Sequence, residues 1–173
     1  DKSLKDRLLA TAFVEAEPIE ALKLKANFGM DLNYMKRQTY LPKTTLYGQK
    51  EGGSAAVSHY DKLDLLMELT ASYNKKIGDH DFGAIAGYSF QSFSDESLDG
   101  SNNRFLIDGF LYHNLGAGNA PKPGVGSSAS RNEMASFFGR FNYSFKDRYL
   151  LTATLRADGA SNFAKEHRWG YFP

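Results

Sequence analysis

Apolar and polar side chains alternate strictly over thirteen residues near the start of this chain. From Leu22 to Tyr34 every even-numbered residue is apolar, and the odd-numbered residues between them are Lys, Asn, Gly or Asp. A helix has 3.6 residues per turn and would scatter these apolar groups around its axis. The pattern therefore predicts a strand with one apolar face and one polar face.

The same period of two recurs further along the chain. Alternating runs cover residues 63–74, 82–91, 135–145 and 149–158, and a less regular extended segment covers about Arg7 to Glu17. Together with the run from Leu22 these segments predict six strands.

The connections between these strands alternate between short and long. The short ones are residues 17–20, 77–81 and 146–147, each with residues that favour turns. The long ones run from about Arg37 to Ser58 and from about Phe93 to Asn132, and the second is rich in Gly and Pro. Long loops are uncommon in compact soluble domains, so they need an explanation.

A transmembrane β-barrel explains this rhythm, because its turns are short on one side of the membrane and long on the other. The runs also match the roughly 9–11 residues that a tilted strand needs to cross a bilayer. Aromatic residues mark the strand ends as an interfacial girdle would; they are Tyr73, Tyr143, Phe145 and Tyr149 beside the short turns, and Tyr34, Tyr60 and Phe90 toward the opposite ends.

The predicted fold class is thus all-β: an antiparallel up-and-down meander of about six long strands. Six strands are too few to close a bacterial barrel, which has at least eight, so the chain is expected to be a fragment of a large one. The alternative is a soluble β-sandwich that binds carbohydrate or mediates adhesion. Such a sandwich also alternates, but its apolar faces must pack on each other.

Composition excludes several other classes. The chain has no cysteine, which excludes disulfides and thiolate chemistry. Its 21 basic and 20 acidic residues are mixed along the sequence and give a net charge of +1, which argues against nucleic-acid binding. No apolar run reaches the roughly 18–20 residues of a membrane-spanning helix.

Candidate chemistry is sparse. The run Asp95–Gly100 resembles the start of a calcium-binding loop, but Leu106 stands where the motif requires Glu, so a solvated acidic loop is the better interpretation. The four histidines lack metal-ligand spacing, and we expect His80 to be a turn residue. We expect no enzyme activity, no metal and no cofactor.

On the polar parity, charged residues are expected to line a hydrated lumen and to contact a plug. These lumen candidates are Lys23, Lys25, Asp31, Glu68, Arg140, Arg156 and Asp158. Arg156 and Asp158 share a face and are expected to pair with each other or with groups of the plug.

The C-terminal residues carry a more specific signal. Residues 146–163 read KDRYLLTATLRADGASNF, and residues 168–173 read RWGYFP. This run closely resembles the barrel motif of the SusC/RagA family of TonB-dependent transporters of Bacteroidetes outer membranes. Residues 77–82 with Gly87 and Tyr88 are similar to another hairpin of that family. Departures from the motif fall in one loop: Ala160, Asn162, Ala164, Glu166 and His167.

The resemblance implies a nutrient importer of the cell outer membrane. It implies a 22-stranded barrel around a plug, partnership with TonB and a SusD-like lipoprotein, and uptake of an oligosaccharide or peptide. Residues 1–173 would be a partial barrel domain, because no plug, TonB box or C-terminal strand is recognisable. Trp169, Tyr171 and Phe172 are expected either to stack on a ligand or to anchor the wall at the lipid interface.

Overall fold

The structure is a computed structural model that describes residues 1–173, and strands dominate it. The strands are β1 (Lys2–Ile19), β2 (Leu22–Leu41), β3 (Ser54–Ile77), β4 (His80–Asn103), β5 (Gly124–Phe145), β6 (Tyr149–Ala160) and β7 (Trp169–Phe172). One short helix, α1 (Leu46–Glu51), and three 3-10 turns, η1 (Asp108–Phe110), η2 (Leu115–Ala117) and η3 (Lys165–His167), lie in the connections.

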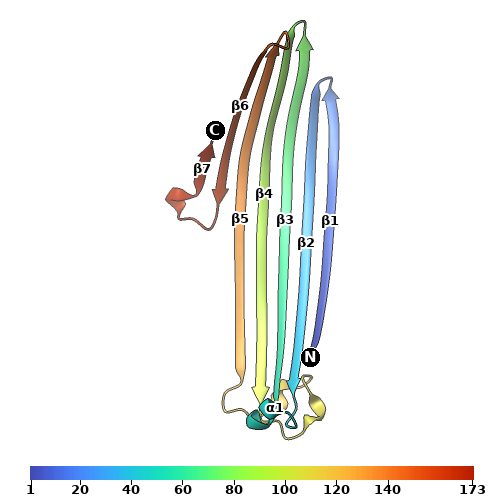
Figure 1. Ribbon diagram of the computed structural model, residues 1–173, viewed down its shortest axis with the longest axis vertical. Coiled ribbons are helices and arrows are strands. Elements are labelled where there is room, and N and C mark those ends of the chain that lie inside the picture. The colour runs from blue at the N-terminus through green and yellow to red at the C-terminus, as the bar shows by residue number, and fades with distance from the viewer. The chain divides into compact units, whose positions relative to one another are not determined.

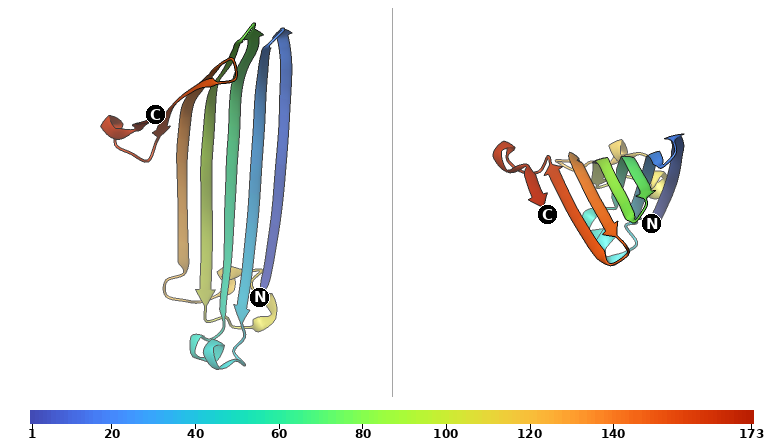
Figure 2. Two further views of the ribbon diagram at one scale, coloured as in Figure 1. Left: turned by 45° about the horizontal axis from the view of Figure 1, so that its top comes forward. Right: turned by 90° about the horizontal axis from the view of Figure 1, so that it is seen from above.

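All seven strands form one sheet in which sequence neighbours pair in the order β1 to β7 (Figures 1 and 2). This is the antiparallel meander that the sequence predicts, with six long strands. The seventh, β7, has four residues and pairs with β6 between Arg156 and Gly159. Strand β7 has no counterpart among the six strands predicted from the sequence.

The predicted strand ends on the long-loop side are wrong. Strands β2, β3, β4 and β5 have 20, 24, 24 and 22 residues, so the long connections shrink to residues 42–53 and 104–123. Tyr34 and Phe90, expected near strand ends, therefore lie within strands. Beyond them both faces of the strands carry polar residues, which removes the alternation that marks a strand in the sequence.

Two of the short turns lie where the sequence places them, whereas the first is Glu20–Ala21 instead of residues 17–20. All three use left-handed backbone, with a φ of 76° at Ala21 in the first. Lys146 and Asp147 have φ values of 53° and 54°, the mirror-image turn that matches the twist of two paired strands. Gly78, with φ 60°, fills the same need in the turn between β3 and β4. His80 begins β4 and is not a turn residue.

The chain divides into two compact units. The loop-end unit contains Asp1–Leu8, Leu32–Leu63 and Ser94–Ser130, and the turn-end unit contains Leu9–Asp31, Asp64–Phe93 and Arg131–Pro173. None of the helices has the length and apolar character to cross a membrane.

Large apolar side chains of the turn-end unit are exposed on one face of the sheet. Phe28, Leu69, Phe137 and Leu151 keep between 42% and 58% of their surface accessible. No second sheet covers them, since all seven strands belong to the same sheet. A β-sandwich would have buried this face, so the alternative prediction lacks its defining feature.

Candidate functional site

Side-chain contacts on the polar face of the turn-end unit join β1 to β2, β2 to β3, and β5 to β6. Lys23 Nζ lies 2.9 Å from Glu15 Oε1, and Asn27 Nδ2 donates to Glu68 Oε1 at 3.3 Å. Thr152 Oγ1 donates to Asn142 Oδ1 at 3.0 Å. These contacts join strands that alternate in direction, so they confirm that the polar parities predicted for separate strands share one face.

The lumen candidates occupy this face in different ways. Arg156 and Asp158 pair with each other, since Arg156 Nε donates to both carboxylate oxygens at 2.8 Å. Arg156 Nη2 also donates to the buried Ser136 Oγ at 3.2 Å. The remaining five candidates come from other strands and do not form one cluster: Lys23, Lys25, Asp31, Glu68 and Arg140.

Several members of the polar face are absent from the sequence-based set. Glu15 and Glu17 both contact Lys23, at 2.9 and 3.4 Å, but they lie in the least regular predicted strand. Lys25 Nζ of β2 lies 5.0 Å from the centre of the Phe13 ring of β1. These ion pairs are exposed, and exposed pairs contribute little to the stability of a fold, so the charges remain available to groups outside this chain.

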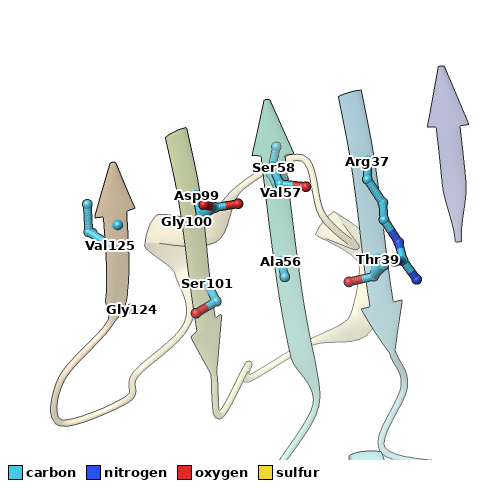
Figure 3. A pocket seen from close by; sticks show the side chains of 11 residues that line it. Arg37, Thr39, Ala56, Val57, Ser58, Asp99, Gly100, Ser101, Gly124 and Val125 are labelled. Carbon is cyan, nitrogen blue, oxygen red and sulfur yellow. The ribbon is translucent and has the colours of Figure 1, made fainter. Parts of the chain in front are cut away.

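The loop-end unit has a hollow of about 580 Å³ on its sheet. Arg37 and Thr39 from β2, Ser58 from β3, and Asp99 and Ser101 from β4 surround it (Figure 3). A Cβ atom at Gly124 of β5 would lie 2.3 Å from Ser101 Oγ, so this glycine keeps the hollow open. The lining offers a guanidinium, a carboxylate and hydroxyls, and no aromatic ring.

Residues 95–100 belong to β4, which corrects the prediction of an acidic loop there. Asp95 Oδ1 accepts a hydrogen bond from Ser130 Oγ at 2.9 Å, and Ser97 and Ser128 share one at 2.8 Å. Hydroxyls and carboxylates therefore follow the β4–β5 pair beyond the predicted ends of both strands.

The two long connections pack together as a loop cap, which we define as residues 42–53 and 104–123 with Tyr40 and Ala55 (Figure 2). Tyr40, Ala55 and Phe105 are its buried core. Lys43 Nζ donates to Leu106 O at 2.8 Å, and Tyr40 Oη donates to Asp108 Oδ1 at 2.5 Å. The cap is thus an ordered element held by contacts between the two connections.

Tyr40 is a titratable group at the centre of the cap. Burial, and then its hydrogen bond to the Asp108 carboxylate, raise the pKa of Tyr40 from 10.0 to about 12. In an unfolded cap the phenol would ionise near pH 10. The stabilisation is therefore complete below pH 10 and is lost as the pH rises through about 12.

We expect Tyr40→Phe to weaken the cap at neutral pH by about 1 kcal/mol, because Asp108 loses its phenol partner. Limited proteolysis of the 104–123 connection in the full-length protein measures this. The difference in cleavage rate between Tyr40→Phe and the wild type should become smaller above pH 10. Tyr47→Phe, at an exposed residue of α1, is the matched control, and equal cleavage of all three proteins would contradict the prediction.

Apolar side chains point outward from the cap. Leu46 and Tyr47 of α1 are 71% and 72% exposed, and Leu106 is 86% exposed. Ile107 and Phe110 are also exposed beside them in the sequence. Leu46–Tyr47 and Leu106–Ile107 thus each expose two consecutive apolar residues on an ordered element, and patches of exposed apolar residues mark sites of interaction with other molecules.

Aromatic rings gather beside the short turns of the turn-end unit. His80 Nδ1 and Tyr143 Oη lie 2.7 Å apart, and the ring centroids of His80 and Phe145 lie 4.7 Å apart. Phe82 lies 5.1 Å from Tyr143 between centroids. His80 is therefore part of an aromatic group that joins the start of β4 to the end of β5.

The C-terminal aromatic residues divide between the two faces. Trp169 pairs with Gly159, and its ring lies 6.0 Å from that of Phe137 on the apolar face. A Cβ atom at Gly159 would lie 2.9 Å from the Trp169 ring, so glycine allows the indole to lie flat on β6. Tyr171 pairs with Ala157 on the same face, whereas Phe172 pairs with Arg156.

Comparisons with known proteins agree on one family. No family model matches the chain. TonB-dependent receptor P3 of Formosa agariphila is 31% identical over all 173 residues, and TonB-dependent receptor SusC of Bacteroides thetaiotaomicron is 30% identical over 152 residues, or 88% of the chain. The chain belongs to the SusC-like TonB-dependent receptors. The motif in residues 146–173 thus identified the family correctly.

The SusC-like segment also shares its fold with a solved structure. The structure of the RagAB peptide transporter superposes on 98% of the chain with a TM-score of 0.88 and 24% sequence identity. The chain spans 17% of receptor P3, 14% of SusC and 19% of the RagAB chain. These relatives are named as receptors and a transporter, and none of the names describes an enzyme.

Proposed function

We propose that this chain forms part of the barrel wall of a TonB-dependent nutrient importer in the cell outer membrane. The observation that carries the proposal is the two-faced sheet of the turn-end unit, polar on one side and exposed and apolar on the other. In a barrel the apolar face meets lipid and the polar face lines a hydrated interior. The segment takes part in transport, and we assign it no catalytic step.

The charged residues of the polar face then face the lumen and the plug. Lys23, Lys25, Asp31, Glu68 and Arg140 supply charge to the interior, and Arg156 with Asp158 forms a fixed pair beside Ser136. Lumen charges of this kind tune which solutes and plug groups the wall accepts. Trp169 and Tyr171, on the apolar face, anchor the wall at the lipid interface.

The loop cap lies at the outer ends of the strands in this proposal, because barrel strands carry their long loops on the extracellular side. Its exposed Leu46, Tyr47 and Leu106 suit a protein partner, and we infer a SusD-like lipoprotein that covers the barrel. The hollow beside Arg37 and Asp99 offers hydrogen bonds to a polar solute. The proposed solute is an oligosaccharide or a peptide, imported with energy transmitted through TonB.

The test uses the full-length receptor that contains this chain. We expect it to fractionate with the outer membrane and to require detergent for extraction. We expect deletion of its gene to abolish uptake of one polymer class, measured with fluorescent oligosaccharides and fluorescent peptides, and loss of TonB to have the same effect. A receptor recovered in aqueous buffer without detergent, or unchanged uptake of both classes in the deletion strain, would contradict the proposal.

A further inference from the structure

A groove of about 510 Å³ crosses the apolar face of the turn-end unit. Its walls are aliphatic side chains from β1, β2 and β3: Val14, Ala16, Leu24, Ala26, Leu69 and Ala71. Alanine at three of these positions leaves the space that a longer side chain would fill. Lys25 and Thr70 also line the groove, but their parity places their side chains on the polar face of the sheet, so the groove suits a hydrocarbon chain.

An unpaired cation, Lys75, lies at the turn end of β3. Lys75 is four residues from Ala71 on β3, and side chains at even spacing share a face of a strand. Lys75 is exposed and forms no hydrogen bond or ion pair. Asp79, in the turn that follows, pairs instead with Lys146 at 3.7 Å. Lys75 is therefore free to meet an anion from outside the chain.

The spacing between the cation and the groove matches one membrane leaflet. At about 3.3 Å per residue, Ala71 lies about 13 Å and Leu69 about 20 Å from Lys75 along the strand. Half of a bilayer's hydrocarbon core is about 15 Å thick. A lipid phosphate beside Lys75 would thus place its acyl chain in the groove.

Aromatic residues fix the level of the interface at the same place. Tyr73 lies between Lys75 and Ala71 on the apolar parity, and it is exposed. Strand β4 contributes the rings of His80 and Phe82, and strand β5 contributes that of Tyr143. Tyrosine and similar amphipathic rings concentrate at the headgroup level of membranes.

We propose that the turn-end unit binds one anionic glycerophospholipid specifically, with its phosphate on Lys75 and an acyl chain in the groove. The positive charge of Lys75 complements a lipid phosphate, and Lys75 lies about one leaflet's depth along β3 from the apolar groove. This combination favours an anionic lipid over a protein partner. The inference rests on the proposed function, because the apolar face must meet a membrane.

Native mass spectrometry of the full-length receptor in mild detergent, titrated with dioleoyl phosphatidylglycerol, tests the site. Loss of one cation should lower lipid affinity about fivefold in Lys75→Gln. Filling the groove with Ala71→Phe should lower it about tenfold, as expected for about two methylenes that are no longer buried.

Two matched variants control for general effects. Lys76→Gln removes the adjacent exposed cation, which lies on the polar parity, and Ala153→Phe adds a ring to the apolar face of β6, outside the groove. Both should bind lipid as the wild type does. Equal affinity in all variants, or equal losses in the controls, would show non-specific annular lipid and overturn the inference. If outer-membrane fractionation and uptake persist in that case, the proposed function stands and only the lipid site fails.

Discussion

Leu69→Arg in the full-length receptor is expected to remove most folded protein from the outer membrane. Leu69 is 42% exposed on the apolar face of β3, eight residues from the end of the strand at Ile77. Arginine on the lipid face near the middle of a membrane costs a β-barrel about 2–4 kcal/mol. The measurement is the heat-modifiable folded band in purified outer membranes, compared with the wild type by immunoblotting.

The matched control is the same substitution one residue further along the strand. Thr70 has the opposite parity, so Thr70→Arg places the charge on the polar face beside a hydrated lumen. We expect near-normal amounts of folded receptor in this variant. Equal loss in both variants, or a stable Leu69→Arg receptor, would contradict the assignment of the apolar face to lipid.

Gly87→Ala is expected to destabilise the folded barrel by about 1–3 kcal/mol. The Phe138 ring lies over Gly87 so closely that an added Cβ would stand 2.2 Å from Phe138 Cζ. The ring would have to move off the β4–β5 pair, where Arg156 also approaches it at 6.0 Å. Urea unfolding of the receptor refolded into lipid vesicles measures the change in the free energy of unfolding.

Two further variants separate this clash from a general effect of alanine in strands. Gly139→Ala meets its nearest neighbour, the Ile85 carbonyl oxygen, at an ordinary 3.7 Å and should be close to neutral. Combining Gly87→Ala with Phe138→Leu removes the ring and should recover part of the loss. An unaltered Gly87→Ala receptor would refute the packing described for this pair.

The fold was predictable where lipid and water impose opposite requirements on the two faces. Residues 22–34 alternate without exception, and the strand and its two faces follow from that pattern. Beyond Phe90, strand β4 continues through Gln91, Ser92 and Ser94 to Asn103. There both faces tolerate polar residues, so periodicity cannot separate a strand from a loop.

Contacts between distant segments were less accessible to sequence reasoning. Asn27 and Glu68 are 41 residues apart, and Tyr40 and Asp108 are 68 apart, so each pairing depends on register or on loop packing. Parity assigned Arg156 and Asp158 to one face because both lie on one strand. The loop cap and the hollow beside Arg37 had no comparable signal, since their residues belonged to predicted loops.

If the two faces of β3 meet lipid and a hydrated lumen, solvent access should alternate from residue to residue along the strand. The chain has no cysteine, so single cysteines can be placed in turn at residues 67–72 of a receptor with no other cysteine. Intact outer membranes are then treated with a membrane-impermeant maleimide. We expect labelling at Glu68, Thr70 and Ser72 through the lumen, and protection at Met67, Leu69 and Ala71 in lipid. Labelling of all six positions, or the reverse alternation, would contradict this expectation.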